Sequence, residues 1–171
     1  MRNKLFTVVS IEDNKPDFEL LKKALEAVSD INIDLINIKN GNNAIDFLYK
    51  KNKYASAPTP NVIILDINLP QINGHEILRS IKKDPYLKVI PVIIFSTSDS
   101  EKDIKESYSL YANSYITKTF NIKELFKKIA IMADYWLKTS ELPPIINYYS
   151  VENLKKPNKK GENNENSSDR W

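Results

Sequence analysis

The chain has 171 residues, of which 42% are hydrophobic and 27% charged, a balance typical of one folded domain with an extension. Its net charge of +3 is too small to predict nucleic-acid binding, and the lack of cysteine excludes a disulfide framework, Cys-ligated zinc and a thiol nucleophile. No apolar run is long enough to cross a membrane and no signal peptide is recognisable, so we expect a cytoplasmic protein without membrane or nucleic-acid partners.

Five apolar, β-rich runs alternate with five helical patterns along the chain. The predicted strands span residues 5–11, 33–38, 62–65, 92–95 and 114–117. The predicted helices begin after Asn14, at Gly41, near Gly74, after Asp99 or Ser100, and at Asn121. Because a helical crossover follows each strand, the order predicts an α/β fold with a five-stranded parallel, doubly wound sheet and right-handed connections.

The last predicted helix runs from Asn121 to about Lys138. Its apolar stripe consists of Ile122, Leu125, Phe126, Ile129, Met132, Ala133 and Trp136. We divide the chain into a domain over residues 1–138, an extension over 139–148 and a polar tail over 149–171. The tail has too little apolar content to order itself, so we expect it to be disordered.

Apolar residues near the end of the chain exceed what a five-stranded domain needs for its core. Tyr135 and Trp136 lie in the last helix, and Leu142 lies in the extension. Trp136 by its helical phase is also compatible with a core position. An apolar surplus of this kind usually marks an interface. We therefore expect the last helix and the extension to form a symmetric homodimer.

Polar side chains end the predicted strands at one edge of the sheet. The central strand is apolar throughout, which is typical of a strand buried on both faces, and it ends in Asp66. Ligands bind at the carboxyl ends of parallel strands, although Asp66 taken alone is equally typical of a turn. The first, fourth and fifth strands bring Glu12 and Asp13, Ser96, and Lys118 to the same edge.

Carboxylates gathered in this way repel one another and need a countercharge. A hard divalent cation supplies it, and Mg²⁺ prefers oxygen ligands, waters and phosphate oxygens. A lysine and a hydroxyl beside that cation would complete a phosphoryl site, in which catalysis consists mostly of placement and charge neutralisation. With Asp66 as the nucleophile, the product would be an acyl phosphate.

In this order, the motifs resemble the response-regulator receiver domain of two-component signalling. The resemblance covers residues 4 to 138 and rests on ED at 12–13, DxNLPxxxG from Asp66 to Gly74, a hydroxyl after PVIIF, and a lysine at the end of SYIT. It implies a flavodoxin-like receiver fold with strand order 2-1-3-4-5. It also implies that Asp66 accepts a phosphoryl group from a histidine kinase.

The resemblance further implies a role for each residue at the strand ends. Mg²⁺ would be held by Asp13, Asp66 and the backbone carbonyl of Asn68, with Glu12 acting through water. Ser96 and Lys118 would hold the phosphoryl oxygens, and Tyr115 would change rotamer together with Ser96. Asn68 and Ser98 stand where receivers tune the lifetime of the phosphate.

A narrower resemblance and three departures refine this interpretation. The Pro-bearing loop over 50–60 and the WLKTSELPP segment look like phytochrome-associated single-domain response regulators, which implies a phytochrome-type kinase as partner.

Receivers usually have a cis Lys-Pro bond, whereas here Lys118 precedes Thr119. We predict a trans bond, because a cis bond to a non-proline costs about 3 kcal/mol. Ser96 stands where threonine is commoner. Tyr111 stands where a small residue often ends the fourth helix, so it is a further candidate interface residue.

The leading hypothesis is a phosphorylation switch whose output surface comprises the fourth helix, the fifth strand and the fifth helix, read by an unknown downstream protein. We expect no output domain and no enzymatic activity beyond self-phosphorylation and self-dephosphorylation at Asp66. The alternatives are a relay intermediate, a pseudo-receiver that binds partners without phosphorylation, and a phosphohydrolase of the haloacid-dehalogenase kind. The last requires an acid two residues after the nucleophile, where this chain has Asn68. His75 is expected to be a solvated helix residue.

Overall fold

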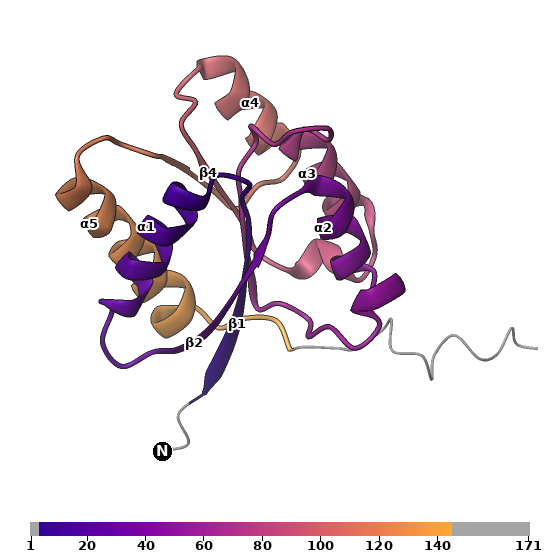
Figure 1. Ribbon diagram of the computed structural model, residues 1–171, viewed down its shortest axis with the longest axis horizontal. Coiled ribbons are helices and arrows are strands. Elements are labelled where there is room, and N and C mark those ends of the chain that lie inside the picture. Colours follow the sequence, from indigo (N-terminus) through magenta and orange to yellow (C-terminus); the bar gives the residue numbers. More distant parts are fainter. Residues whose placement is uncertain (1–3, 145–171) are drawn as a thin grey trace, which may run out of the picture.

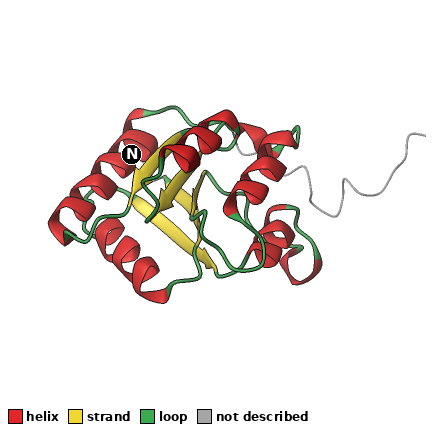
Figure 2. Cartoon of the chain, turned by 90° about the horizontal axis from the view of Figure 1, so that it is seen from above, coloured by secondary structure: helices red, strands yellow, loops and turns green. Residues whose placement is uncertain are grey.

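Five parallel strands form the centre of the protein, and helices cover both faces of their sheet (Figures 1 and 2). The computed structural model describes residues 4–144. The strands are β1 (Leu5–Ile11), β2 (Asn32–Ile38), β3 (Val62–Leu65), β4 (Val92–Ser96) and β5 (Ser114–Thr117). Their spatial order is β2-β1-β3-β4-β5, so the predicted fold class and strand order are confirmed.

Each α-helix begins after a polar side chain that accepts a hydrogen bond from a backbone N–H of the first turn. The helices are α1 (Lys15–Glu26), α2 (Gly41–Leu48), α3 (Gly74–Lys83), α4 (Glu101–Ser109) and α5 (Ile122–Ala133), and their caps are Asn14, Asn40, Asn73, Ser100 and Asn121. These caps satisfy N–H groups that lack a partner within the helix. Between Ser100 and Asp99, the structure therefore selects Ser100 as the cap of α4. Within residues 4–144, no helix combines the length and apolar character needed to span a membrane.

The core consists of two layers separated by the sheet. Helices α1 and α5 pack on one face, and α2 and α3 pack on the other (Figure 1). Strand β3 contributes to both layers, because Ile63 and Leu65 face α2 and α3 whereas Val62 and Ile64 face α1 and α5. All four residues are buried, as the unbroken apolar run predicted. This central strand places Asp66 at the middle of the sheet edge.

The end of the last helix differs from the prediction. Regular α-helix stops at Ala133, and a π-helical segment (Asp134–Thr139) follows, in which the N–H of Ser140 donates to the carbonyl of Tyr135. A π-helical turn is wider than an α-helical turn, so the position that faces the core comes one residue later. Leu137 is therefore buried, whereas Trp136, which the predicted stripe placed inside, is only partly buried. At the other end of the stripe, Ile122 was expected inside but is 56% exposed, because it is the first residue of α5 and lies at the open edge of the sheet.

The described part of the C-terminal extension lies against the core. Leu142 packs against the layer formed by α1 and α5. Residues 145–148 of the predicted interface segment and the predicted disordered tail over 149–171 lie outside the described residues.

Tyr111 ends α4 in the left-handed region, with φ of 65°. The N–H of Ala112 donates to the carbonyl of Ser107, and that of Tyr111 donates to the carbonyl of Tyr108, which together form a Schellman motif. Glycine usually fills this position because a Cβ makes the conformation costly. The Tyr111 side chain is nevertheless 76% exposed, so it recovers none of that cost by burial.

Replacing Tyr111 with glycine should therefore stabilise the protein. We expect Tyr111→Gly to raise the free energy of unfolding by about 1 kcal/mol, since the left-handed conformation is no longer strained. Urea denaturation followed by circular dichroism measures the change. Tyr108→Gly is the matched control, because Tyr108 lies inside α4 and glycine there should lower stability. Equal destabilisation by both substitutions would contradict the prediction.

Candidate functional site

The carboxyl ends of four strands meet at one edge of the sheet. Ile11 pairs with Leu65, so the residues that follow them, Glu12 and Asp66, are neighbours. Ser96 pairs with Thr117, and the N–H of Lys118 donates to the carbonyl of Ser96 at 2.7 Å. The parallel ladder thus brings together Glu12, Asp66, Ser96 and Lys118, as the sequence predicted.

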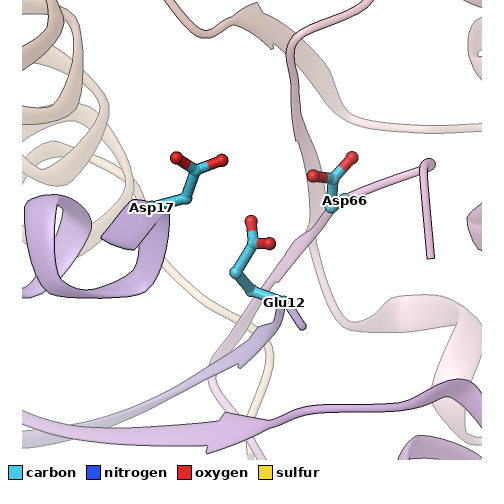
Figure 3. Close-up of side chains that lie close together, drawn as sticks. All are labelled: Glu12, Asp17 and Asp66. Carbon is cyan, nitrogen blue, oxygen red and sulfur yellow. The ribbon is translucent and has the colours of Figure 1, made fainter. Parts of the chain in front are cut away.

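A buried ammonium group lies among three carboxylates at this edge. The Nζ of Lys118 is 2.5 Å from Glu12, 2.7 Å from Asp66 and 2.8 Å from Asp17. Figure 3 shows the three acids, with Glu12 at the end of β1, Asp66 at the end of β3 and Asp17 on α1. The Lys118 side chain is only 7% exposed, so these contacts compensate a charge that has left water.

Burial and neighbouring charge have opposite effects on the pKa of Glu12, and likewise on the pKa of Lys118. Burial raises the pKa of Glu12 to about 7, and the hydrogen bond and charge of Lys118 oppose the rise without cancelling it. Burial also disfavours the charged form of Lys118, but the charge of Asp66 and the hydrogen bonds to Asp17, Asp66 and Glu12 outweigh it and raise the pKa of Lys118. The surrounding carboxylates therefore favour the charged form of Lys118.

Both oxygens of Asp66 already accept a hydrogen bond. Its Oδ1 accepts from the backbone N–H of Asn68 at 2.9 Å, and its Oδ2 accepts from Lys118. The Asn68 side chain reaches across to β4, where its Nδ2 donates to the Oγ of Ser96 at 3.1 Å. Asn68 therefore connects the Asp66 loop to the buried hydroxyl of Ser96.

Asp17 is the member of the site that the sequence analysis missed. Oxygen atoms of Glu12, Asp17 and Asp66 all lie within 4.8 Å of one another. Asp13 is exposed and does not belong to this group, so its predicted role as a ligand stays a prediction. The signal for Asp17 was its place one helical turn after Asp13, in the first turn of the helix that Asn14 caps.

The group of three carboxylates suits a divalent cation of the Mg²⁺ type. All its donors are carboxylate oxygens, the ligands that Mg²⁺ prefers, and one ammonium balances only part of their charge. The donor set fits Mg²⁺ and equally fits other hard cations such as Mn²⁺.

Comparisons with known proteins agree with this geometry. Residues 8–130 match the model of the response regulator receiver domain. The chain belongs to the response-regulator receiver family.

Among its relatives, response regulator Rcp1 of Synechocystis sp. is 41% identical over 136 residues, which cover 80% of this chain and 92% of Rcp1. The crystal structure of the phosphorylated cyanobacterial phytochrome response regulator RcpA is 39% identical, with a TM-score of 0.79, and the match covers 82% of this chain and all of RcpA. The Mn²⁺-bound structure of Rcp1 is 40% identical, with a TM-score of 0.77, over 81% of this chain and 99% of that one.

The β4–α4 loop of this receiver is held by two of the predicted residues. The hydroxyl of Tyr115 donates to the carbonyl of Ser98 at 2.8 Å, so its side chain points toward this loop. The hydroxyl of Ser98 donates to the Asp103 carboxylate in the first turn of α4. The rotamer change of Tyr115 and the lifetime roles of Asn68 and Ser98 stay predictions.

His75 is buried, contrary to the prediction of a solvated helix residue. It is 5% exposed, and its Nε2 lies 2.9 Å from the Oγ of Ser107 on α4. Its Nδ1 lies 3.7 Å from the Glu106 carboxylate, which also pairs with Arg79. The sequence pattern of α3 did not reveal this contact, because the partners of His75 come from another helix.

The bond between Lys118 and Thr119 is trans, as predicted, and no peptide bond within residues 4–144 is cis. Lys118 still points into the carboxylate group with the trans bond. The departure from the usual Lys-Pro sequence therefore leaves the lysine at the site.

The predicted interface residues of the last helix border a groove beside β5. The groove has a volume of about 470 Å³ and is lined by residues of β5 and of the last helix, including Tyr115, Ile131, Tyr135 and Trp136. The rings of Tyr135 and Trp136 pack edge to face, with centroids 5.1 Å apart. Their role as interface residues, with Tyr111 and Leu142, stays a prediction.

Gly74 allows α3 to begin directly against the loop that carries Asp66. A Cβ at this position would lie 2.3 Å from the carbonyl oxygen of Asp66 and 2.6 Å from the Cα of Ile67. Both neighbours are backbone atoms, so a side chain would displace the loop that carries Asp66. The glycine of the DxNLPxxxG motif therefore fixes the position of Asp66 through close packing.

We expect Gly74→Ala to lower the free energy of unfolding by about 1–3 kcal/mol, because the added methyl group overpacks two backbone segments. Chemical denaturation measures this loss, and ¹H–¹⁵N spectra should show the largest changes around Asp66. Glu76→Ala, at an exposed position of the same helix, is the control and should change stability by less than about 0.5 kcal/mol. Similar effects of the two substitutions would show that the close contact is unimportant.

Proposed function

We propose that this receiver is a phosphorylation switch in which Asp66 accepts a phosphoryl group from a histidine kinase, with Mg²⁺ as the cofactor. The observation that carries the proposal is the convergence of Asp66, Glu12 and Lys118 at the strand ends. Two relatives support it by what was found in their crystals, since RcpA was solved in a phosphorylated form and Rcp1 with Mn²⁺.

In the proposed step, one carboxylate oxygen of Asp66 forms a bond to phosphorus as the bond between phosphorus and the donor's nitrogen breaks. The electron pair of the broken bond leaves with the imidazole of the kinase. Lys118 is already 2.7 Å from Asp66 and would neutralise charge on the phosphoryl oxygens. The N–H of Asn68 holds the other Asp66 oxygen and so orients the nucleophile.

Bound at this site, Mg²⁺ would supply positive charge to the transferring group. Asp66 would hold the ion together with the predicted ligands Asp13 and the backbone carbonyl of Asn68, and Glu12 would act through water. The hydroxyl of Ser96 accepts from the Asn68 side chain, so its own proton would be available to bind a phosphoryl oxygen. We propose no enzymatic turnover beyond gain and loss of the phosphoryl group at Asp66.

A phytochrome-type kinase is the proposed phosphoryl donor, because RcpA is named as a cyanobacterial phytochrome response regulator. Because such a kinase takes phosphate from ATP, we propose that the encounter occurs in the cytoplasm. The proposed output surface comprises α4, β5 and α5, which Tyr115 and Ser98 connect to the acceptor end of the sheet. A relay role would use the same site, whereas a phosphorylation-independent pseudo-receiver is disfavoured by the intact group of Asp66, Glu12 and Lys118.

The acceptor role predicts that Mg²⁺ and acetyl phosphate together phosphorylate the full chain at Asp66. Asp66→Asn should abolish the reaction, because the amide is not a nucleophile of this kind. Intact-mass spectrometry detects the added phosphoryl group, and chelation of Mg²⁺ should prevent its addition. Asp34→Asn, at an exposed position of β2, is the control and should be phosphorylated like the wild type. Labelling of the Asp66→Asn variant, or none of the wild type, would refute the proposal.

We also propose that the groove between β5 and the last helix forms part of a homodimer interface. Ile131 borders this groove and is 59% exposed, so Ile131→Asp should weaken the dimer about tenfold or more. Sedimentation equilibrium, with and without beryllofluoride, measures the dissociation constant. Val89→Asp is a matched control, because Val89 is 52% exposed but lies in the turn before β4. A wild-type monomer under both conditions would rule out this interface.

A further inference from the structure

The third carboxylate around Lys118 comes from a helix, whereas the other two follow strands. Asp17 is the third residue of α1, and its N–H donates to the Asn14 side chain that caps the helix. Its carboxylate lies 2.8 Å from the Nζ of Lys118. An acid in a first turn commonly complements the helix dipole. That role does not require the carboxylate to reach a buried lysine on the far side of the site.

The number of hydrogen-bond donors on Lys118 indicates a second role for Asp17. An ammonium group has three N–H donors, and here they go to Glu12, Asp17 and Asp66. A cation that uses an oxygen of Asp66 directly and one of Glu12 through water competes with Lys118 for both carboxylates. Asp17 is then the one carboxylate of the three that remains available to the buried ammonium.

A cavity adjoins the ion pair of Asp17 and Lys118. Asp17 and Lys118 together border a cavity of about 290 Å³, whose other lining residues include Leu20, Thr119 and Phe120. The Lys118 ammonium already lies 2.8 Å from Asp17, so it can keep this partner without moving. A buried ammonium that lost two partners and gained none would be costly, so the remaining ion pair matters.

We propose that Asp17 is a positioning residue that holds Lys118 while Glu12 and Asp66 turn to the divalent cation. The inference rests on the proposed function, because it assumes that the strand-end carboxylates bind the metal. It assigns Asp17 an effect on metal affinity that acts through Lys118 and involves no metal–Asp17 bond.

A double-mutant cycle on the full chain tests the inference with Mn²⁺ as the probe. Electron paramagnetic resonance of the free ion gives the dissociation constant for the wild type, Asp17→Asn, Lys118→Met and the double variant. Removing a carboxylate weakens cation binding in any background, so the deciding quantity is the effect of Asp17→Asn with and without Lys118. We expect a loss of about fivefold with Lys118 and of less than about twofold without it.

Three further variants make the result specific. Glu19→Gln removes another carboxylate of α1 that is not among those in contact with Lys118, and it should leave the dissociation constant unchanged. Asp17→Glu keeps a carboxylate within reach and should restore binding to within about twofold of the wild type. Lys118→Gln replaces Lys118→Met in the cycle if the methionine variant does not fold, as judged by circular dichroism.

The outcomes separate this inference from the proposed function. An unchanged affinity in Asp17→Asn would overturn the inference and leave the acceptor site intact. An equal or larger loss without Lys118 would make Asp17 a direct metal ligand and would also overturn it. A wild-type chain that binds no Mn²⁺ would overturn the proposed function, and the inference with it.

Discussion

The compensation of one buried positive charge is the constraint on which the carboxyl-terminal edge of the sheet depends. Lys118 leaves water almost completely, and it is stable there because Glu12, Asp17 and Asp66 surround its ammonium group. The parallel sheet supplies two of these acids, since neighbouring strands deliver their last residues to one edge. The capped start of α1 supplies the third. The fold therefore determines the charge balance of this site, because it positions all three acids.

The same edge is connected to the far side of the domain by a short series of contacts. Asn68 joins the Asp66 loop to Ser96, and the N–H of Ser98 lies 3.4 Å from the Ser96 hydroxyl. The carbonyl of Ser98 in turn accepts from Tyr115, whose ring borders the groove beside β5. On the other side, α3 begins against the backbone of Asp66, and His75 joins α3 to α4. These contacts are the physical links through which a change at Asp66 would reach the proposed output surface.

The sequence was sufficient for the sheet and for most of the site, because both follow from short-range patterns. Apolar runs gave the five strands to within about a residue, and the polar residues that end them gave Glu12, Asp66, Ser96 and Lys118. Asp17 escaped notice because its contact depends on how the first turn of α1 meets the end of β5. The burial of His75 likewise depends on Ser107 from another helix. Contacts between elements distant in sequence were the part that local patterns did not encode.

The π-helical segment at the end of α5 has a consequence for how partner choice could diverge among related chains. Each residue of an α-helix advances the side chains by about 100°, and a π-helical turn advances them by a smaller angle. Here Leu137 is buried, and Tyr135 and Trp136 lie along the groove. Ordinary α-helix over the same residues would turn different side chains toward the groove. A local change of helix type could thus alter what this surface recognises, while the chemistry at the strand ends stayed the same.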